Sequence, residues 1–347
     1  MRRTVPVLGA LALAAAATLL PGAPASADHL KVVELPVAFS VKNTNTTPVP
    51  CLSDGLDYTV KGHIVAPAAA LDAPRAATLY LHAVTWGEYY WRLKGVAGYD
   101  YASNMAEKGH VSVTIDRIGY GASGRPDGNG GTCFGSEADV AHQIVQALKG
   151  GSYSVTGHAP AAFKKVFVAG SSVGGMTAEI ESYSFHDSDG IINFGWGEYR
   201  ITDYAFKEYN ELMARCAKGG DTGAPPNYGT FAVSTIQKFY FNSATPDVRA
   251  STPRANPDPC SQARSIPPGI MTDMKNIGTI DVPVLSIFGD ADAIFDQSAA
   301  KEQGGRYTGS PDSTLVMVPE ASHYPLVEKN HLDAEAAVDK FLSKYSG

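Results

Sequence analysis

Basic residues are scarce in this sequence, and they form no stripe along the chain. It contains 28 Lys and Arg against 35 Asp and Glu, which gives a formal net charge of −7 at pH 7. A nucleic-acid partner needs clustered cations that meet its phosphate backbone. The acidic balance therefore argues against nucleic-acid binding and is consistent with solubility outside the cell.

An apolar stretch long enough to span a membrane is also lacking, because the run at residues 5–20 is short and no stop-transfer pattern follows it. Residues 1–3 form a basic head before this run, and the small-residue site Ala25-Ser26-Ala27 follows it. This order is typical of a secretory signal peptide. We expect residues 1–27 to be removed by cleavage near Ala27, and the mature chain to be secreted without an integral membrane segment.

The apolar positions predict an α/β fold. Residues 31–65 alternate apolar and polar side chains, as antiparallel edge strands do. Later apolar runs are continuous, which is typical of strands buried on both faces of a mostly parallel sheet. These runs lie at residues 77–81, 111–115, 166–169, 191–196, 282–289 and 314–318. Helices are expected between them, at residues 99–108, 137–148, 174–185, 297–303 and 332–345.

Between residues 197 and 278 the pattern changes. Helices are expected at 199–217 and 230–242, whereas residues 243–269 are rich in Pro, Ser and Asp and show little periodicity. A strandless insertion of this length between two sheet strands indicates a cap over a site. We therefore expect a core made of residues 28–196 and 279–347, with a cap insertion at 197–278.

Cysteine is the rarest reactive residue, and its spacing excludes a zinc cluster because no Cys-x-x-Cys pair occurs. The four cysteines are Cys51, Cys133, Cys216 and Cys260. An even number in an exported protein favours two disulfides, which allow three connectivities. We prefer Cys51–Cys133 in the core and Cys216–Cys260 in the insertion, because each bond then closes a loop within one structural unit.

The stretch from Lys165 to Met176 contains the pattern Gly170-x-Ser172-x-Gly174 at the end of a predicted strand. This spacing is that of a nucleophile elbow, in which a serine occupies a sharp strand-to-helix turn. Small residues are needed two positions to either side, because a Cβ there would collide with the adjoining strand or helix. The alternative is an ordinary Gly/Ser turn that leads into a helix.

A second turn follows the strand at 111–115 and has the pattern Asp-x-x-Gly-x-Gly-x-Ser-x-x-Pro, from Asp116 to Pro126. A phosphate-binding loop is excluded because no lysine follows its glycines at the required place. Together with the elbow, this turn resembles the α/β-hydrolase fold superfamily, and the resemblance covers essentially the whole mature chain. It implies a mostly parallel central sheet flanked by helices, a structural brace at Asp116 and Ser123, and a cap that shapes the substrate pocket.

The resemblance also implies a catalytic triad in the chain order serine, acid, histidine. Ser172, Asp292 and His323 each follow a predicted strand, so all three are expected at one edge of a parallel sheet. Asp290 and Glu198 are alternative acids, because each also follows a strand. Asp296 is most simply a helix N-cap. His82 could be taken for the catalytic base, but a histidine at the end of a buried strand is more often a hydrogen-bonded structural residue.

Stabilisation of an oxyanion is expected from the backbone N–H groups of Val173 and Val84. The superfamily often has a His-Gly pair at the second position, where this chain has His82-Ala83. The aromatic residues Trp86, Tyr89 and Trp196 are candidates for a substrate pocket. The first two could equally form the packed face of the following segment.

These features predict a secreted serine hydrolase that cleaves carboxylic esters, with lactones as a further substrate class, through an acyl-enzyme. Its partner would be a small-molecule or lipid-like ester, and no metal or organic cofactor is implied. The alternatives are a peptidase or amidase of the same fold, and a catalytically silent binding protein on this scaffold. Ser172 argues against epoxide hydrolases and haloalkane dehalogenases, which carry an aspartate at the elbow.

Overall fold

The computed structural model describes residue 1 and residues 31–347, so the predicted signal peptide at 1–27 lies outside the described residues except for Met1. None of the helices in this described part combines the length and the apolar character needed to cross a bilayer.

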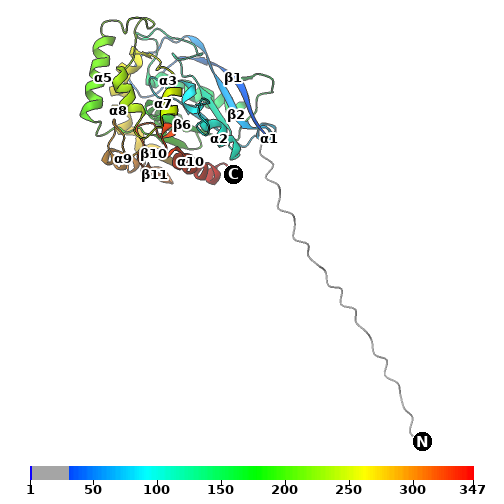
Figure 1. Cartoon of the computed structure of the whole chain (residues 1–347). Coiled ribbons are helices and arrows are strands. Elements are labelled where there is room, and N and C mark those ends of the chain that lie inside the picture. Colours follow the sequence, from blue (N-terminus) through cyan, green and yellow to red (C-terminus); the bar gives the residue numbers. More distant parts are fainter. Residues whose placement is uncertain (2–30) are drawn as a thin grey trace.

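A nine-stranded sheet forms the centre of the molecule (Figure 1). In spatial order its strands are β11 (Ser313–Val318), β10 (Val284–Gly289), β7 (Ile191–Phe194), β6 (Lys165–Ser171), β3 (Ala76–Leu81), β4 (Ser112–Ile115), β2 (Asp57–Pro67), β1 (Val32–Lys42) and β5 (Ser154–Val155). The six strands from β11 to β4 are parallel, and β2, β1 and β5 add an antiparallel edge. The predicted mostly parallel sheet with an antiparallel edge is confirmed.

Helices cover both faces of this sheet, because neighbouring residues of a buried strand point to opposite sides. On one face, Tyr80 and Phe167 pack with α2 (Tyr101–Glu107) and α10 (His331–Tyr345). On the other face, Leu79, Val166 and Val168 pack with α3 (Phe134–Gly150). Helices α4 (Val173–Phe185) and α9 (Gln297–Gly304) complete the layers, and the short α1 (Ala68–Asp72) lies within the segment that joins β2 to β3.

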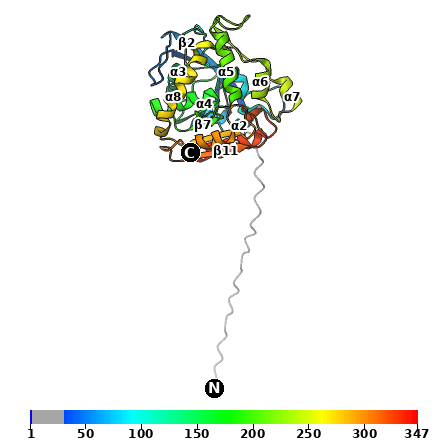
Figure 2. The same ribbon diagram turned by 90° about the vertical axis from the view of Figure 1, so that its left-hand side faces the viewer.

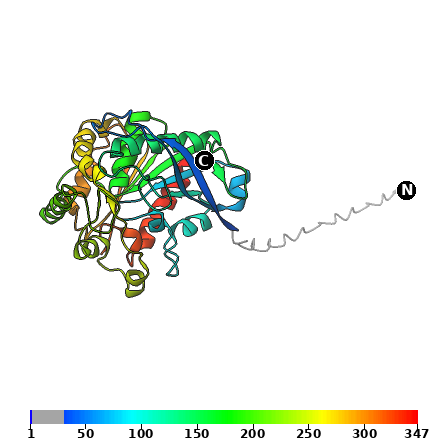
Figure 3. The ribbon, with the colours of Figure 1, turned by 90° about the horizontal axis from the view of Figure 1, so that it is seen from above.

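The insertion lies between β7 and β10, which are neighbours in the sheet. Figure 2 looks onto it, and Figure 3 shows its yellow and light-green helices on the side opposite the long blue strands of the antiparallel edge. It contains α5 (Asp203–Cys216), α6 (Val233–Tyr240), α7 (Pro246–Ser251) and α8 (Cys260–Asn276). The division of the chain at residues 197 and 278 stays a prediction.

Two expectations for the insertion are wrong. It is not strandless, because β8 (Tyr228–Gly229) and β9 (Asp258–Pro259) form a small antiparallel sheet. Residues 243–269 are also more regular than expected, since they contain α7 and more than half of α8. Pro267 and Pro268 lie inside α8, and prolines normally end a helix. The helix continues through them because its buried side packs against α4, with Gly269 facing Met176.

The two disulfides join Cys51 to Cys133 and Cys216 to Cys260, which is the pairing preferred from the sequence. The first connects the β1–β2 loop to the start of α3, and the second connects the end of α5 to the start of α8. Each bond therefore fastens elements within the core or within the insertion.

Candidate active site

The turn between β6 and α4 holds Ser172 in a conformation that few non-glycine residues adopt, with φ 54° and ψ −125°. A Cβ on Gly170 would lie 1.9 Å from the carbonyl oxygen of Gly174, and one on Gly174 would lie 2.3 Å from that of Leu81. Both positions therefore require glycine. The Ser172 N–H donates to the carbonyl of Phe194 at 2.8 Å, which ties the turn to the end of β7.

His323 and Asp292 lie in the turns that follow β11 and β10. The His323 Nδ1 atom is 2.7 Å from Asp292 Oδ2, and both side chains are fully buried. The other oxygen, Asp292 Oδ1, accepts the N–H groups of Ile294 at 2.7 Å and Phe295 at 3.2 Å. These bonds orient the carboxylate so that one oxygen is directed at the imidazole.

The His323 ring and Ser172 both pack at the end of β7. A Cβ on Gly195 would lie 3.4 Å from His323 Cε1, and the preceding residue, Phe194, accepts the Ser172 N–H. His323 Nε2 is buried and has no hydrogen-bond partner within the described part of the chain. The ring thus presents one nitrogen to a carboxylate and leaves the other without a hydrogen-bond partner.

The two alternative acids are placed elsewhere. Glu198 is buried and accepts a hydrogen bond from Gln303 Nε2 at 3.0 Å, and its carboxylate lies near those of Glu179 and Asp273. Burial raises the pKa of Glu198. These three carboxylates could share protons or hold a cation, but none of them contacts His323. Asp290 is exposed, with its N–H bonded to Val318.

Other residues singled out in the sequence have structural roles. Asp296 caps α9 by accepting the N–H of Ala299 at 2.9 Å, as expected. His82 is fully buried; its Nδ1 is 2.8 Å from the carbonyl of Ala83 and its Nε2 accepts the N–H of Arg117 at 3.0 Å. Burial, with the charge of Arg117 beside it, holds the pKa of His82 well below its usual value. Such an imidazole stays neutral and has no free nitrogen to act as a base.

The turn at Asp116 acts as a brace. One carboxylate oxygen of Asp116 accepts the N–H of Glu88 and the other accepts that of Ala122, both at 2.9 Å. The Ser123 hydroxyl donates to the carbonyl of Asp116 at 2.6 Å and accepts the N–H of Lys61. The side chains of this turn thus connect the segments after β3 and β4 to strand β2.

A cavity of about 290 Å³ lies between the carboxyl edge of the sheet and the insertion. Ser172, Val173 and Val84 reach it from the core. The rest of its wall is almost wholly apolar and is formed by Thr85, Trp196, Ile201, Ala205, Phe206, Tyr209, Phe231, Phe239, Ile266, Pro267, Ile270, Met271, Ile294, Phe295 and Tyr324. Phe206 and Met271 are each more than half exposed, so they belong to both the cavity and the outer surface.

Of the predicted pocket residues, Trp196 lines this cavity, whereas Trp86 and Tyr89 do not, which corrects the prediction for those two. Trp86 is fully buried and stacks on Tyr240 of α6, with ring centroids 4.1 Å apart and an interplanar angle of 15°. The aromatic segment after β3 is thus a packing surface for the insertion.

The loop that carries Val84 is held by side chains that sequence reasoning missed. Thr85, at φ 63°, donates its N–H to Asp258 Oδ1 at 2.7 Å. Its hydroxyl lies 2.7 Å from that of Tyr240. Asp258 and Tyr240 both belong to the insertion, 173 and 155 residues further along the chain. No local sequence signal marks either residue, because their roles depend on contacts made only in the fold.

No protein-family model matches the sequence, and no curated protein matches it. Among solved structures, a thermophilic esterase from Thermogutta terrifontis has a similar fold, with a TM-score of 0.60 at 16% identity over 89% of this chain and 100% of that one. A monoacylglycerol lipase from Paleococcus ferrophilus gives 0.56 at 15% identity over 78% and 96%. An E-2-(acetamidomethylene)succinate hydrolase gives 0.55 at 15% identity over 82% and 96%. At these identities the likeness is one of fold.

Proposed function

Since the chain has the α/β-hydrolase fold, we propose that it is a serine hydrolase that cleaves carboxylic esters through an acyl-enzyme on Ser172. The observation that carries this proposal is the arrangement at the sheet edge. A strained, glycine-flanked serine faces an apolar cavity, and a buried His–Asp pair lies against the same strand end.

In the proposed reaction the Ser172 hydroxyl attacks the ester carbonyl while His323 Nε2 takes its proton. His323 then gives this proton to the leaving alcohol, and a water molecule releases the acyl group by the same steps in reverse order. Asp292 keeps Nδ1 protonated and stabilises the positive imidazolium at 2.7 Å. Ser172 and His323 must come within hydrogen-bond distance for the first transfer.

The negative charge on the tetrahedral intermediate requires two hydrogen-bond donors. Val173 lies in the first turn of α4, where peptide N–H groups have no partner within the helix. Val84 lines the same cavity, on the loop held by Asp258 and Tyr240. Removing one such donor costs about 3 kcal/mol of barrier in related chemistry.

The cavity favours an apolar acyl or alcohol group over a charged one. Its wall offers aliphatic and aromatic side chains and few polar atoms, and its volume suits a small ester. The named activities of the Thermogutta esterase and the Paleococcus lipase support ester cleavage as the class of reaction. The two disulfides support the proposed export, because such bonds persist in oxidising compartments.

The test is hydrolysis of nitrophenyl esters of increasing acyl length by the wild type and by Ser172→Ala. We expect turnover by the wild type and a loss of roughly 10⁴-fold or more in the variant. Ser171→Ala is the matched control, since Ser171 is the adjacent, fully buried serine that does not line the cavity. It should retain most of the activity.

Three further results would decide between the alternatives. Asp292→Asn should lower kcat about as strongly as removal of a triad acid does elsewhere, roughly 10⁴-fold, while Glu198→Gln and Asp290→Asn keep it within a few-fold.

Labelling of Ser172 by a fluorophosphonate would be absent in a silent binding protein. A wild type inert toward esters but active on nitroanilides would replace the esterase proposal with an amidase.

A further inference from the structure

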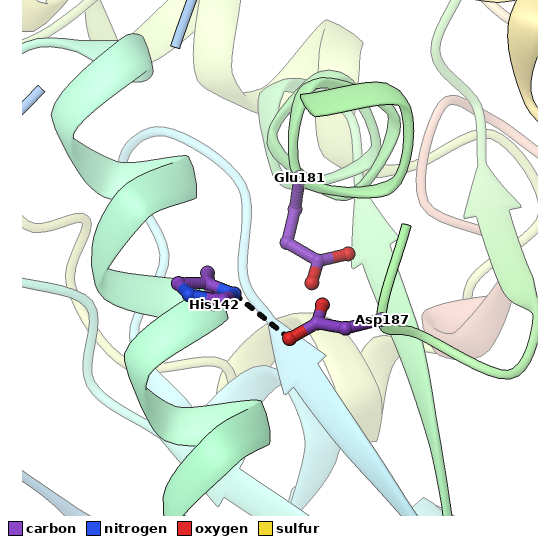
Figure 4. Close-up of side chains that lie close together, drawn as sticks. All are labelled: His142, Glu181 and Asp187. Atoms are coloured by element: carbon purple, nitrogen blue, oxygen red, sulfur yellow. Dashed lines mark ion pairs between the residues drawn. The ribbon is translucent and has the colours of Figure 1, made fainter. Parts of the chain in front are cut away.

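A second group of chemically active side chains lies away from the Ser172 cavity. His142 on α3, Glu181 on α4 and Asp187 in the loop after α4 direct their side chains to one point (Figure 4). One donor atom from each lies within 4.8 Å of the others, and His142 Nδ1 is 2.8 Å from Asp187 Oδ2. Glu181 is nine residues beyond Ser172, about 13 Å along the helix, so this group takes no part in the proposed ester chemistry.

The environment of Glu181 sets this group apart from an ordinary surface ion pair. Its side chain is fully buried, and neither carboxylate oxygen has a hydrogen-bond partner within the described part of the chain. Figure 4 shows this carboxylate directed at that of Asp187, whose Oδ1 atom is also buried and unpaired. Two carboxyl groups that face each other without a donor repel one another unless a proton or a cation lies between them.

Neighbouring side chains hold His142 and Asp187 in their orientations. The His142 ring stacks on Phe185, with centroids 4.0 Å apart at 12°, which fixes the direction of Nδ1. Gln146 donates to Asp187 Oδ2, and Lys149 donates to the Asp187 main-chain carbonyl at 2.5 Å. His142 and Asp187 keep 28% and 15% of their side chains exposed, so an ion can reach the group from solvent.

We propose that His142, Glu181 and Asp187 form a structural site for a divalent transition-metal ion, with Zn²⁺ as the best fit. One imidazole nitrogen and two carboxylates are a donor set that zinc accepts, whereas calcium prefers oxygen ligands alone and more of them. The ion occupies the space between the Glu181 and Asp187 carboxylates and replaces the direct contact between His142 Nδ1 and Asp187 Oδ2, neither of which has the other as a hydrogen-bond partner. It joins α3 to the end of the elbow helix and to the loop that leads into β7.

Zinc binding to the purified, chelator-treated protein tests this proposal. We expect one zinc per chain, measured by metal analysis after equilibrium dialysis, and a thermal midpoint that rises with zinc. His142→Gln and Glu181→Gln should each weaken binding by roughly ten-fold or more and abolish the thermal shift. His142 is partly exposed, so its variant should fold even if the change at buried Glu181 does not allow folding.

The matched control is His110→Gln, because His110 Nε2 forms a 2.7 Å pair with Asp339 that lacks a third ligand. This variant should bind zinc as the wild type does. The proposal is overturned if the wild type binds no stoichiometric zinc, or if His142→Gln binds it unchanged. Tighter binding of calcium than of zinc would overturn the choice of a transition metal.

Discussion

The two core loops that line the cavity, one at Ser172 and one at Val84, are built in different ways. The turn at Ser172 is held by backbone packing in the core, where Gly170 and Gly174 leave no room for a side chain. The loop at Val84 and Thr85 is held by side chains of the insertion. Under the proposed function, one oxyanion donor therefore depends on backbone packing within the core, and the other depends on hydrogen bonds from the insertion.

The polar surroundings of the two loops, the elbow and the loop at Val84, also differ. The elbow is held by backbone contacts, whereas buried polar side chains continue from the second loop. Asp258 also accepts the Tyr120 hydroxyl at 2.7 Å, and Gln262 Oε1 lies 2.9 Å from that hydroxyl. Arg117 pairs with Glu137, and Gln262 of α8 bonds both Glu137 and the carbonyl of Ile118. Burial raises the pKa of Glu137 to about 7 against the opposing charge of Arg117. Changes at Asp258 or Tyr240 should thus alter the second loop more than the elbow.

Among the variants that distinguish the two loops, the largest effect is expected from Gly174→Ala, which places a Cβ inside the elbow turn. Its Cβ would meet the Leu81 carbonyl oxygen at 2.3 Å, and neither backbone segment can yield easily. We expect a loss of roughly 3 kcal/mol or more in the free energy of unfolding. The displaced first turn of α4 should lower kcat/KM by roughly 100-fold or more. Thermal denaturation and ester hydrolysis measure the two losses.

Gly130→Ala is the control for that variant. Gly130 lies in a surface turn, has no atom within 4 Å of a built Cβ, and does not have a positive φ. It should change stability and activity very little. If Gly174→Ala behaved like Gly130→Ala, the elbow would not be held by backbone contact with β3.

This contrast also explains how far the sequence could predict the site. The glycine spacing at 170–174 is a local pattern whose steric cause operates within a few residues, so the elbow was predictable. The strand-end positions of Asp292 and His323 follow from the order of apolar runs, and the structure brings these two side chains into contact. Asp258 was not predictable, because a carboxylate that bonds an N–H 173 residues away leaves no periodic or short-range trace.

The helix α8 was missed for a related reason. Its two internal prolines argue locally against a helix, and its contacts with α4 outweigh that preference. The pocket residues Trp86 and Tyr89 were assigned by residue type, which does not say whether an aromatic ring faces a cavity or packs against another helix. In both cases tertiary packing decided an outcome that local chemistry left open.

A smaller effect, confined to the second loop, is expected from Asp258→Ala. This change leaves the buried N–H of Thr85 without an acceptor, at a cost of about 1–3 kcal/mol, and frees the Val84–Thr85 peptide to move. We expect kcat to fall by roughly 10- to 100-fold, with KM changed much less, because the donor acts in the transition state. Steady-state kinetics on the preferred nitrophenyl ester measure this split.

Asp258→Asn is the matched variant, since its amide oxygen can still accept from Thr85. It should recover most of the kcat lost in the alanine variant. Equal losses in both variants would mean that the charge of Asp258, rather than its hydrogen bond to the loop, matters. No loss in either would show that the loop does not depend on the insertion.

The most gradual effect concerns pH. Burial raises the pKa of Asp258 to about 7, against hydrogen bonds from Thr85 and Tyr120 that favour the charged form. In the unfolded chain an aspartate titrates near pH 4. Between these two pH values the folded protein keeps a proton on Asp258 that the unfolded chain has released. The contribution of Asp258 to the free energy of unfolding therefore falls as pH rises from about 4 to 7, and it does not change further above pH 7.

Asp258→Asn cannot ionise, so its thermal midpoint should rise relative to that of the wild type as pH increases through this window. At most about 1.4 kcal/mol per pH unit is involved, which corresponds to about 2 °C per unit in a protein of this size. Thermal denaturation from pH 4.5 to 8 measures the difference, with Asp72→Asn as the control because that side chain is 80% exposed. A difference in thermal midpoint between Asp258→Asn and the wild type that stays constant with pH would contradict the raised pKa of Asp258. It would also contradict the idea that a buried, titratable side chain holds the second loop, whereas none holds the elbow.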